Sequence, residues 1–257
     1  MALEELAPLA RAAGFEALSM RASALSVDTS PHRIDAVRRL LDREQLAVSM
    51  VMGNVALAAN TADAPACLRY ITPHLDLAER LGAGLVRVML QQPDDIAAAQ
   101  RAADEAAERG MSLAQQTHWG TLCETVDDAI DLVRRVDRPN FGITFEPANL
   151  LACGSDCGGD AVRRLAPYMV NFYFQNVRLD PEGAHRFKTR HRGDVTLTYL
   201  ALDDPEGIPV APLVAALADV GYQGWVTVHQ PLRAGQRVPQ AIDEAVRVFQ
   251  PFVAAAN

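Results

Sequence analysis

The sequence predicts an α/β protein, a (β/α)8 TIM-type barrel that lacks its first strand in this chain. Three observations lead to this fold class. The chain has 257 residues, and one such barrel takes roughly 250. Short apolar strands alternate with amphipathic helices, which is typical of βαβ units around a parallel sheet. No linker or low-complexity tract divides the chain, so a single domain over residues 1–257 is expected.

The order of elements begins with a helix at residues 3–13, closed by Gly14, and a strand at Ala17–Met20 follows. Further strands are predicted at residues 46–52, 85–90, 112–118, 141–146, 170–177 and 225–229. Further helices are predicted at residues 31–45, 64–81, 93–109, 125–136, 160–165, 209–220 and 239–254. The polar stretch at residues 180–207 is expected to be a loop. Seven strands are readable where a closed barrel has eight, so the missing strand should precede the first helix.

The composition of the chain limits the kinds of molecule that the protein is expected to bind. The net charge of −8 argues against nucleic acid, whose phosphates need a basic surface. No apolar run approaches the roughly 20 residues of a membrane span, and the first residues do not resemble a signal peptide. Four cysteines are too few for a disulfide scaffold, and Cys153 and Cys157 lack a second pair that would complete a zinc site. We therefore expect a cytoplasmic protein with a small-molecule partner, and a homo-oligomer is compatible with the sequence.

Several segments carry a resemblance to a known family. They are Gly-Phe-Glu-Ala-Leu at residues 14–18, Leu-Gly-Ala-Gly-Leu-Val-Arg at residues 81–87, Gln-Thr-His at residues 116–118, Gly-Ile-Thr-Phe-Glu-Pro at residues 142–147, Tyr-Phe-Gln-Asn at residues 173–176, and Gly-Tyr-Gln-Gly-Trp-Val-Thr-Val-His at residues 221–229. Together they resemble the sugar phosphate isomerase/epimerase group of the xylose isomerase-like TIM barrel superfamily. The likeness extends over nearly the whole chain.

The resemblance implies a divalent metal held by Glu, Asp, His and Glu at four strand ends. This chain departs at each of them, with Gln116, Glu146, Tyr173 or Gln175, and His229. Glu146, His229, Gln116 and Gln175 could still offer oxygen and imidazole donors to Mg²⁺, Mn²⁺ or Zn²⁺. The set carries one formal negative charge, so a metal-assisted and a metal-free site both stay open. No nucleotide cofactor is expected.

Side chains two residues apart on a strand share a face, and the carboxyl ends of barrel strands form one mouth. Glu146, His229 and His118 are of the type that performs acid–base catalysis. Polar residues placed to bind substrate are Arg87, Gln116, Asn149, Asn176 and Arg178. The basic run at residues 185–192 is a further candidate for contact with an anionic ligand, although such a run is more often a solvated surface.

These observations predict a sugar or sugar-acid isomerase or epimerase that works by proton transfer at the barrel mouth. One alternative is a lyase or dehydratase acting on a polyol-derived keto acid, because both reactions begin with proton abstraction. Another is a non-catalytic sugar-binding barrel that has lost the metal site of the family.

Overall fold

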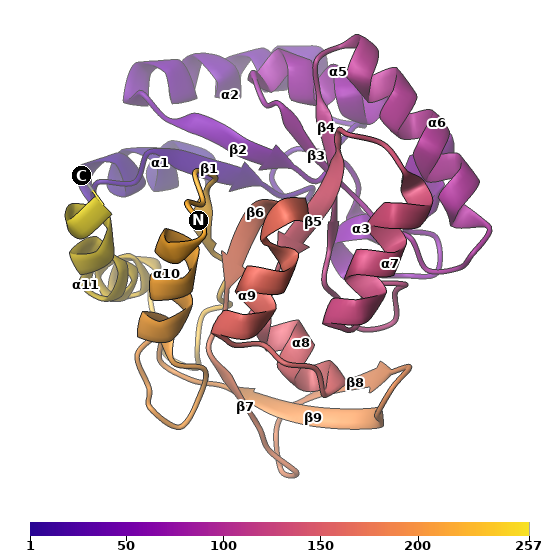
Figure 1. Cartoon of the computed structure of the whole chain (residues 1–257). Coiled ribbons are helices and arrows are strands. Elements are labelled where there is room, and N and C mark those ends of the chain that lie inside the picture. The colour runs from indigo at the N-terminus through magenta and orange to yellow at the C-terminus, as the bar shows by residue number, and fades with distance from the viewer. Residues whose placement is uncertain (257) are drawn as a thin grey trace. The chain divides into compact units, whose positions relative to one another are not determined.

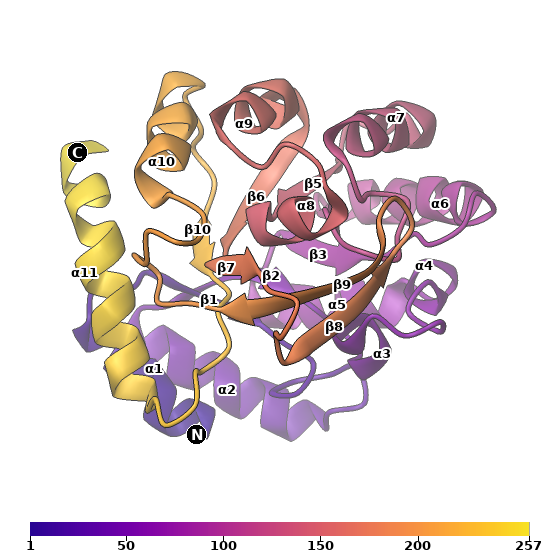
Figure 2. The ribbon, with the colours of Figure 1, turned by 90° about the horizontal axis from the view of Figure 1, so that it is seen from below.

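The computed structural model describes residues 1–256, with side chains described as far as residue 252. The chain forms two compact units. The first comprises Met1–Gln115 and Arg135–Gly142, and the second comprises Gln116–Arg134 and Ile143–Asn257. Figure 1 labels most of the helices and strands of both, and Figure 2 adds α4 and β10. The single domain predicted for residues 1–257 stays a prediction.

All seven predicted parallel strands are present, in the order β1-β2-β3-β4-β5-β6-β10. The first unit contains the parallel neighbours β1 (Ala17–Met20), β2 (Ala47–Val51) and β3 (Leu85–Val88), and all of β4 (Ser112–Gln116) except Gln116. The second contains most of β5 (Phe141–Phe145), together with β6 (Met169–Phe174) and β10 (Val226–Val228). The predicted α/β barrel class, with one strand fewer than eight, is confirmed.

Helices separate the strands as the sequence predicts. Those of the first unit are α1 (Leu3–Ala12), α2 (Pro31–Glu44), α3 (Val55–Ala59), α4 (Ala66–Arg69), α5 (Thr72–Leu81) and α6 (Asp95–Glu108). Those whose residues lie wholly or mostly in the second unit are α7 (Val126–Val136), α8 (Pro147–Cys153), α9 (Gly159–Leu165), the 3-10 turn η1 (Ala166–Tyr168), α10 (Val210–Asp219) and α11 (Val238–Ala256). No helix in residues 1–256 is both long and apolar enough to cross a membrane.

Local signals account for several helix boundaries. Ser30 caps α2 by accepting a hydrogen bond from the backbone N–H of Arg33 at 3.4 Å, and Pro31 occupies the first helical position. Gly82 ends α5 with a φ of +68°, a left-handed conformation that glycine adopts without a steric penalty. The single helix predicted at residues 64–81 is wrong. Tyr70, with φ −131° and ψ 54°, breaks it into α4 and α5, and Pro73 then sits in the first turn of α5.

The second correction concerns the polar stretch at residues 180–207. The structure forms a second sheet of three antiparallel strands there, in the order β7-β9-β8, from β7 (Val177–Leu179), β8 (His185–Thr189) and β9 (Gly193–Tyr199). The basic run therefore lies on a strand and its turn. Val195 and Leu197 are buried while Arg186 and Lys188 are exposed, an alternation with the period of a strand.

Each unit has an apolar interior on which its strands lie. In the second unit, Phe145 of β5 and Phe172 of β6 stack with ring centroids 5.4 Å apart and planes at 9°, and both are buried. Aromatic pairs of this kind contribute more than their buried area alone. This packing fixes the register of β5 against β6, on which the polar residues at the ends of these strands depend.

Candidate active site

Glu146 stands at the point where β5 ends and α8 begins. Its backbone N–H donates to Thr117 Oγ1 at 2.8 Å, and the Thr117 hydroxyl donates to the Glu146 carbonyl at 3.2 Å. Thr117 N also donates to the carbonyl of Thr144 at 3.0 Å, which continues the strand pairing. These bonds hold the Glu146 backbone at the strand end, so the direction of its side chain is set by the sheet.

The Glu146 carboxylate is fully buried. Its Oε2 accepts a hydrogen bond from Gln116 Nε2 at 2.8 Å and lies 3.2 Å from His229 Nδ1. Its Oε1 is buried and has no hydrogen-bond partner among the described residues. A buried polar atom without a partner is costly and uncommon in a native structure, and it is often explained by a ligand or an ordered water.

His229 is the second member of this cluster, and its side chain is 19% exposed. Gln175 Nε2 lies 3.0 Å from His229 Nδ1 and also donates to the His229 carbonyl. The ring of Tyr173 packs on the imidazole with centroids 4.5 Å apart. The structure therefore brings together the four residues Gln116, Glu146, Gln175 and His229, which the sequence placed at strand ends.

The donor set bears on the metal that the resemblance implies. The unpartnered Glu146 Oε1 could face a cation, but Glu146 is the only carboxylate of the four. Gln116 directs its amide N–H toward Glu146, and Gln175 directs its own toward His229. No group of three or more His, Cys, Asp or Glu residues suited to a metal occurs in the described part of the chain. A divalent ion here would leave excess positive charge in a buried site, so these residues do not fit a resident divalent metal.

Two other predicted residues lie close to this cluster in the chain. His118 sits just beyond β4, with its Nδ1 2.9 Å from the Trp119 carbonyl and its ring packed on the Trp119 indole at 4.7 Å. Asn149, in the first turn of α8, donates from Nδ2 to the Thr117 carbonyl at 3.0 Å. Both positions border the strand ends, and their predicted roles stay predictions.

Among the described residues, the polar contacts of the Asn176 and Arg178 side chains are not with Glu146, since Asn176 binds backbone groups and Arg178 pairs with two other carboxylates. Asn176 Nδ2 donates to the carbonyls of Ala201 at 2.7 Å and Asp204 at 3.1 Å, and its Oδ1 accepts from Ile208 N at 2.7 Å. Arg178 pairs with Asp180 at 3.3 Å and with Glu206. Their substrate-binding role stays a prediction, but the geometry explains both residues as anchors of the segment after β6.

Arg87 belongs to the first unit. It lies on β3, is 2% exposed, and its Nη1 is 3.5 Å from Met52 Sδ. The sequence analysis grouped it with the polar residues at strand ends, and the structure buries it within the strand. Its predicted role in substrate binding is not tested by these contacts.

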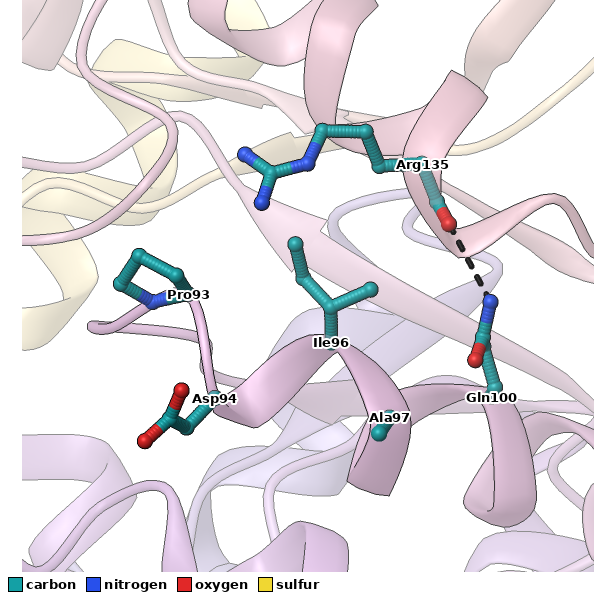
Figure 3. A pocket seen from close by; sticks show the side chains of 6 residues that line it. All are labelled: Pro93, Asp94, Ile96, Ala97, Gln100 and Arg135. Carbon is teal, nitrogen blue, oxygen red and sulfur yellow. Dashed lines mark hydrogen bonds between the residues drawn. The ribbon is translucent and has the colours of Figure 1, made fainter.

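A surface groove of about 580 Å³ lies elsewhere on the first unit. Figure 3 shows the residues that line it, which are Pro93, Asp94, Ile96, Ala97, Gln100 and Arg135. Gln100 Nε2 donates to the Arg135 carbonyl at 3.2 Å across one side. None of the predicted site residues lines this groove, and we assign it no function.

Sequence reasoning missed two supporting residues, Thr117 and Asn171. Thr117 was quoted only as part of a motif, although it holds the Glu146 backbone. Asn171 Nδ2 lies 3.4 Å from Thr144 Oγ1, and both residues are fully buried below the strand ends. The alternation of Asn171, Tyr173 and Gln175 along β6 was an available signal, since residues two apart share a face.

Comparison with known proteins agrees with this architecture. The family described as xylose isomerase-like TIM barrel matches residues 7–252. The Rhizopine catabolism protein MocC of Rhizobium meliloti is 26% identical over 237 residues, which is 81% of this chain and 70% of that protein. The fold resembles that of the probable 3-DHS dehydratase AsbF of Bacillus anthracis, with a TM-score of 0.75, 16% identity, and coverage of 97% of this chain and 94% of the other.

Two further solved structures share the fold. One is a xylose isomerase-like TIM barrel protein of Mycobacterium smegmatis in complex with magnesium (TM-score 0.71, 18% identity, 98% of this chain and 88% of the other). The other is D-psicose 3-epimerase of Clostridium cellulolyticum H10 with D-tagatose (TM-score 0.69, 16% identity, 98% and 92%). Proteins of this fold thus include an epimerase, a dehydratase and a magnesium complex. On the family match, this chain belongs to the xylose isomerase-like TIM barrel family.

Proposed function

We propose that this protein is an enzyme that isomerises or epimerises a small sugar or sugar acid by proton transfer, with Glu146 and His229 as its acid–base pair. The observation that carries the proposal is the fully buried carboxylate whose Oε2 faces His229 Nδ1 while its Oε1 lacks a described partner. A buried base held beside an imidazole is a common arrangement for moving protons near neutral pH.

In the proposed reaction, Glu146 Oε1 removes a proton from the substrate carbon beside a carbonyl group. The electron pair of that C–H bond forms a C=C bond, and the carbonyl electrons move to oxygen to give an enediolate. His229 supplies a proton to that oxygen. For inversion, water delivers a proton to the other face of the same carbon, the oxygen gives its proton back to His229 as the carbonyl re-forms, and Glu146 releases its proton to water. For isomerisation, Glu146 passes its proton to the neighbouring carbon, and the hydroxyl group on the first carbon gives its proton to His229 as it becomes the new carbonyl. No atom is gained or lost overall.

The neighbouring side chains support this role for Glu146. Gln116 donates to Oε2, which holds that oxygen in place and leaves Oε1 as the carboxylate oxygen without a described partner. Tyr173 packs on the imidazole and Gln175 Nε2 lies 3.0 Å from its Nδ1, so the ring has little rotational freedom. Substrate contacts from His118, Asn149, Asn176 and Arg178 belong to this proposal as well.

A dehydratase is the second candidate, because its reaction starts with the same proton abstraction and then expels a hydroxide as water from the next carbon. One matched structure is a probable dehydratase, and it supports this candidate only through its shared fold. The two candidates differ in their products. An isomerase or epimerase conserves substrate mass, whereas a dehydratase product is lighter by one water molecule.

The first experiment is a thermal-shift screen of sugars, sugar acids and keto acids, followed by product analysis by mass spectrometry for every compound that stabilises the protein. Incorporation of solvent deuterium at carbon without loss of mass supports isomerisation or epimerisation. A ligand that stabilises the protein but is never turned over would support the non-catalytic alternative.

Substitutions then test the roles of the residues. Glu146→Gln and His229→Ala should each reduce kcat/KM on the order of 10² to 10⁴-fold, the usual loss when an acid–base group is removed. Gln116→Ala should cost about tenfold, because it removes one hydrogen bond. Full activity in Glu146→Gln with the true substrate would refute the proposal.

A further inference from the structure

The three-stranded sheet of residues 177–199, which we name the flap, begins and ends beside β6. β7 follows Asn176 directly, and Leu200 N returns to donate to the Asn176 carbonyl at 3.0 Å. Figures 1 and 2 both place the flap alongside α8, the helix that starts immediately after Glu146. The base of the flap is thus attached where β6 delivers Gln175 to the site.

The far end of the flap rests on the loop that follows β4. Phe187 of β8 packs on Trp119 with ring centroids 4.7 Å apart, and Trp119 in turn packs on His118. This loop continues directly from Gln116 and Thr117. The flap therefore bridges from the end of β6, past α8, to the loop after β4, and it connects the three segments that supply Gln175, Glu146 and Gln116.

One buried carboxylate holds the tip of the flap to this loop. Glu124 is fully buried, and its Oε1 accepts from Gly120 N at 2.6 Å and from Arg190 N at 2.8 Å. Its Oε2 accepts from Arg190 N at 2.8 Å and His191 N at 3.1 Å. Three backbone N–H groups, two of them from the turn between β8 and β9, thus surround a single carboxylate. Convergent backbone N–H groups are a strong binding arrangement for an anion.

A weaker surface contact lies next to this one. His191 Nε2 is 2.9 Å from Asp128 Oδ2, but both side chains are substantially exposed. Exposed ion pairs contribute little to stability, whereas a buried acceptor that loses its donors is costly. Arg192 Nη1 of the same turn also donates to the Leu151 carbonyl at 3.3 Å, in an exposed position. Of these three contacts at the tip, the one made by Glu124 should therefore dominate.

We propose that the flap closes the Glu146–His229 site on this side and that Glu124 is the positioning residue that latches it shut. Release of the two turn N–H groups from Glu124 frees the tip, while the base stays attached at Asn176. The loop at residues 118–125 loses its packing against Phe187 at the same moment. This inference concerns access to the site and holds whether the site isomerises, dehydrates or only binds its ligand.

Glu124→Gln is the direct test. The glutamine amide keeps one oxygen that accepts hydrogen bonds, but its second oxygen is replaced by an NH2 group. This group cannot accept from the backbone N–H groups that now bind the carboxylate. We expect the opening equilibrium of the flap to rise at least tenfold, which is the effect of leaving one buried donor unsatisfied. Hydrogen–deuterium exchange should quicken at least tenfold in residues 185–199 and stay unchanged in β5 and β6. Asp128→Asn is the matched control, with little expected change.

Two further readouts report on the site itself. In a Trp225→Phe background, Trp119 is the remaining tryptophan, since the chain has two. Its emission should shift to longer wavelength in Glu124→Gln as Phe187 leaves it. Modification of His118 and His229 by diethylpyrocarbonate, followed by peptide mass spectrometry, should quicken several-fold, while that of the exposed His32 of α2 should not change.

The outcomes separate the proposal from its rivals. Faster exchange throughout the second unit would mean that Glu124 supports the whole fold, which overturns the latch. A mobile flap with unchanged modification of His118 and His229 would show that the flap does not close the site. Should Glu124→Gln fail to fold, Arg190→Pro removes a donor N–H from the exposed turn instead, and the same two criteria apply.

Discussion

His74 offers a sharp test of how burial controls the pH dependence of stability in the first unit. It lies on α5, is 3% exposed, and its Nδ1 has no hydrogen-bond partner among the described residues. Its ring packs against Gly53, where an added Cβ would lie 2.1 Å from Nδ1. Burial lowers the pKa of His74 from 6.5 to about 4, and the nearby Asp28 offsets only a small part of this effect.

The sign follows from proton linkage. Because the folded pKa is lower than the unfolded one, the unfolded chain takes up the proton first as the pH falls. The stability is fully present above the unfolded value of 6.5 and is lost as the pH falls toward the folded value of about 4. The whole shift corresponds to about 3 kcal/mol, and about 2 kcal/mol of it is lost by roughly pH 5. Carboxylates with lowered pKa values, such as Asp203 and Glu244, also change the stability with pH, but they do so at lower pH than His74.

The assay compares urea unfolding of the unchanged protein and of His74→Leu at pH 5 and pH 7. The leucine variant should lose about 2 kcal/mol less stability between these two pH values, because it has no proton to take up. Between pH 7.5 and 8.5 the difference between the two proteins should be constant. An identical pH dependence for both proteins, or a His74 C–H resonance that titrates near pH 6.5, would refute the reasoning.

Two further predictions concern single buried polar side chains. Asn176→Ala should lower the free energy of unfolding by about 2–4 kcal/mol, because it leaves buried backbone groups of residues 201–208 without partners. Urea unfolding of this variant, compared with that of Asn149→Ala, measures the loss. Asp95→Ala should lower the free energy of unfolding by about 1–2 kcal/mol, because Asp95 Oδ2 accepts hydrogen bonds from Gln91 N and Gln92 N, each at 2.9 Å, at the start of α6. Equal stability of Asp94→Ala and Asp95→Ala would contradict this prediction.

Strand positions could be predicted because their signals are local. Runs of apolar residues between the ends of helices predicted β1 with its exact bounds. They placed the other six parallel strands within a few residues of their observed bounds. Parity along a strand then put Gln116, Glu146 and His229 on the same side. The contacts among them follow from this parity, because neighbouring parallel strands present their ends together.

The errors at residues 180–207 and at Glu124 share a cause, which is that the decisive interactions are long-range. The segment at residues 180–207 is polar because one face of β8 and β9 is solvated, and its buried residues, such as Val195 and Leu197, are too few to stand out. Glu124 belongs to no sequence motif, and its two partners in the flap lie 66 and 67 residues away along the chain. Only the fold shows that this carboxylate is buried.

The metal prediction depends on charge, and substitution can change that charge. Gln116→Glu together with His229→Glu would place three carboxylates where Glu146 now stands alone, with Gln116 Nε2 only 2.8 Å from Glu146 Oε2 in the unchanged protein. Three carboxylates cannot all stay ionised at this spacing without a cation, so the double variant should be unstable alone and should bind Mn²⁺.

The size of the effect can be estimated from linkage. Mn²⁺ at 100 times its dissociation constant should stabilise the variant by about 2.7 kcal/mol, which raises Tm by roughly 5–10 °C in a chain of this length. The unchanged protein should show no such rise, and its metal content after extensive dialysis, measured by elemental mass spectrometry, should be far below one ion per chain. An equal rise in both proteins would mean that one carboxylate with neutral donors is enough to hold the ion. The Gln116 and Gln175 amides would then have to present oxygen rather than nitrogen to the site, and the metal-free proton transfer proposed for Glu146 and His229 would have to be abandoned.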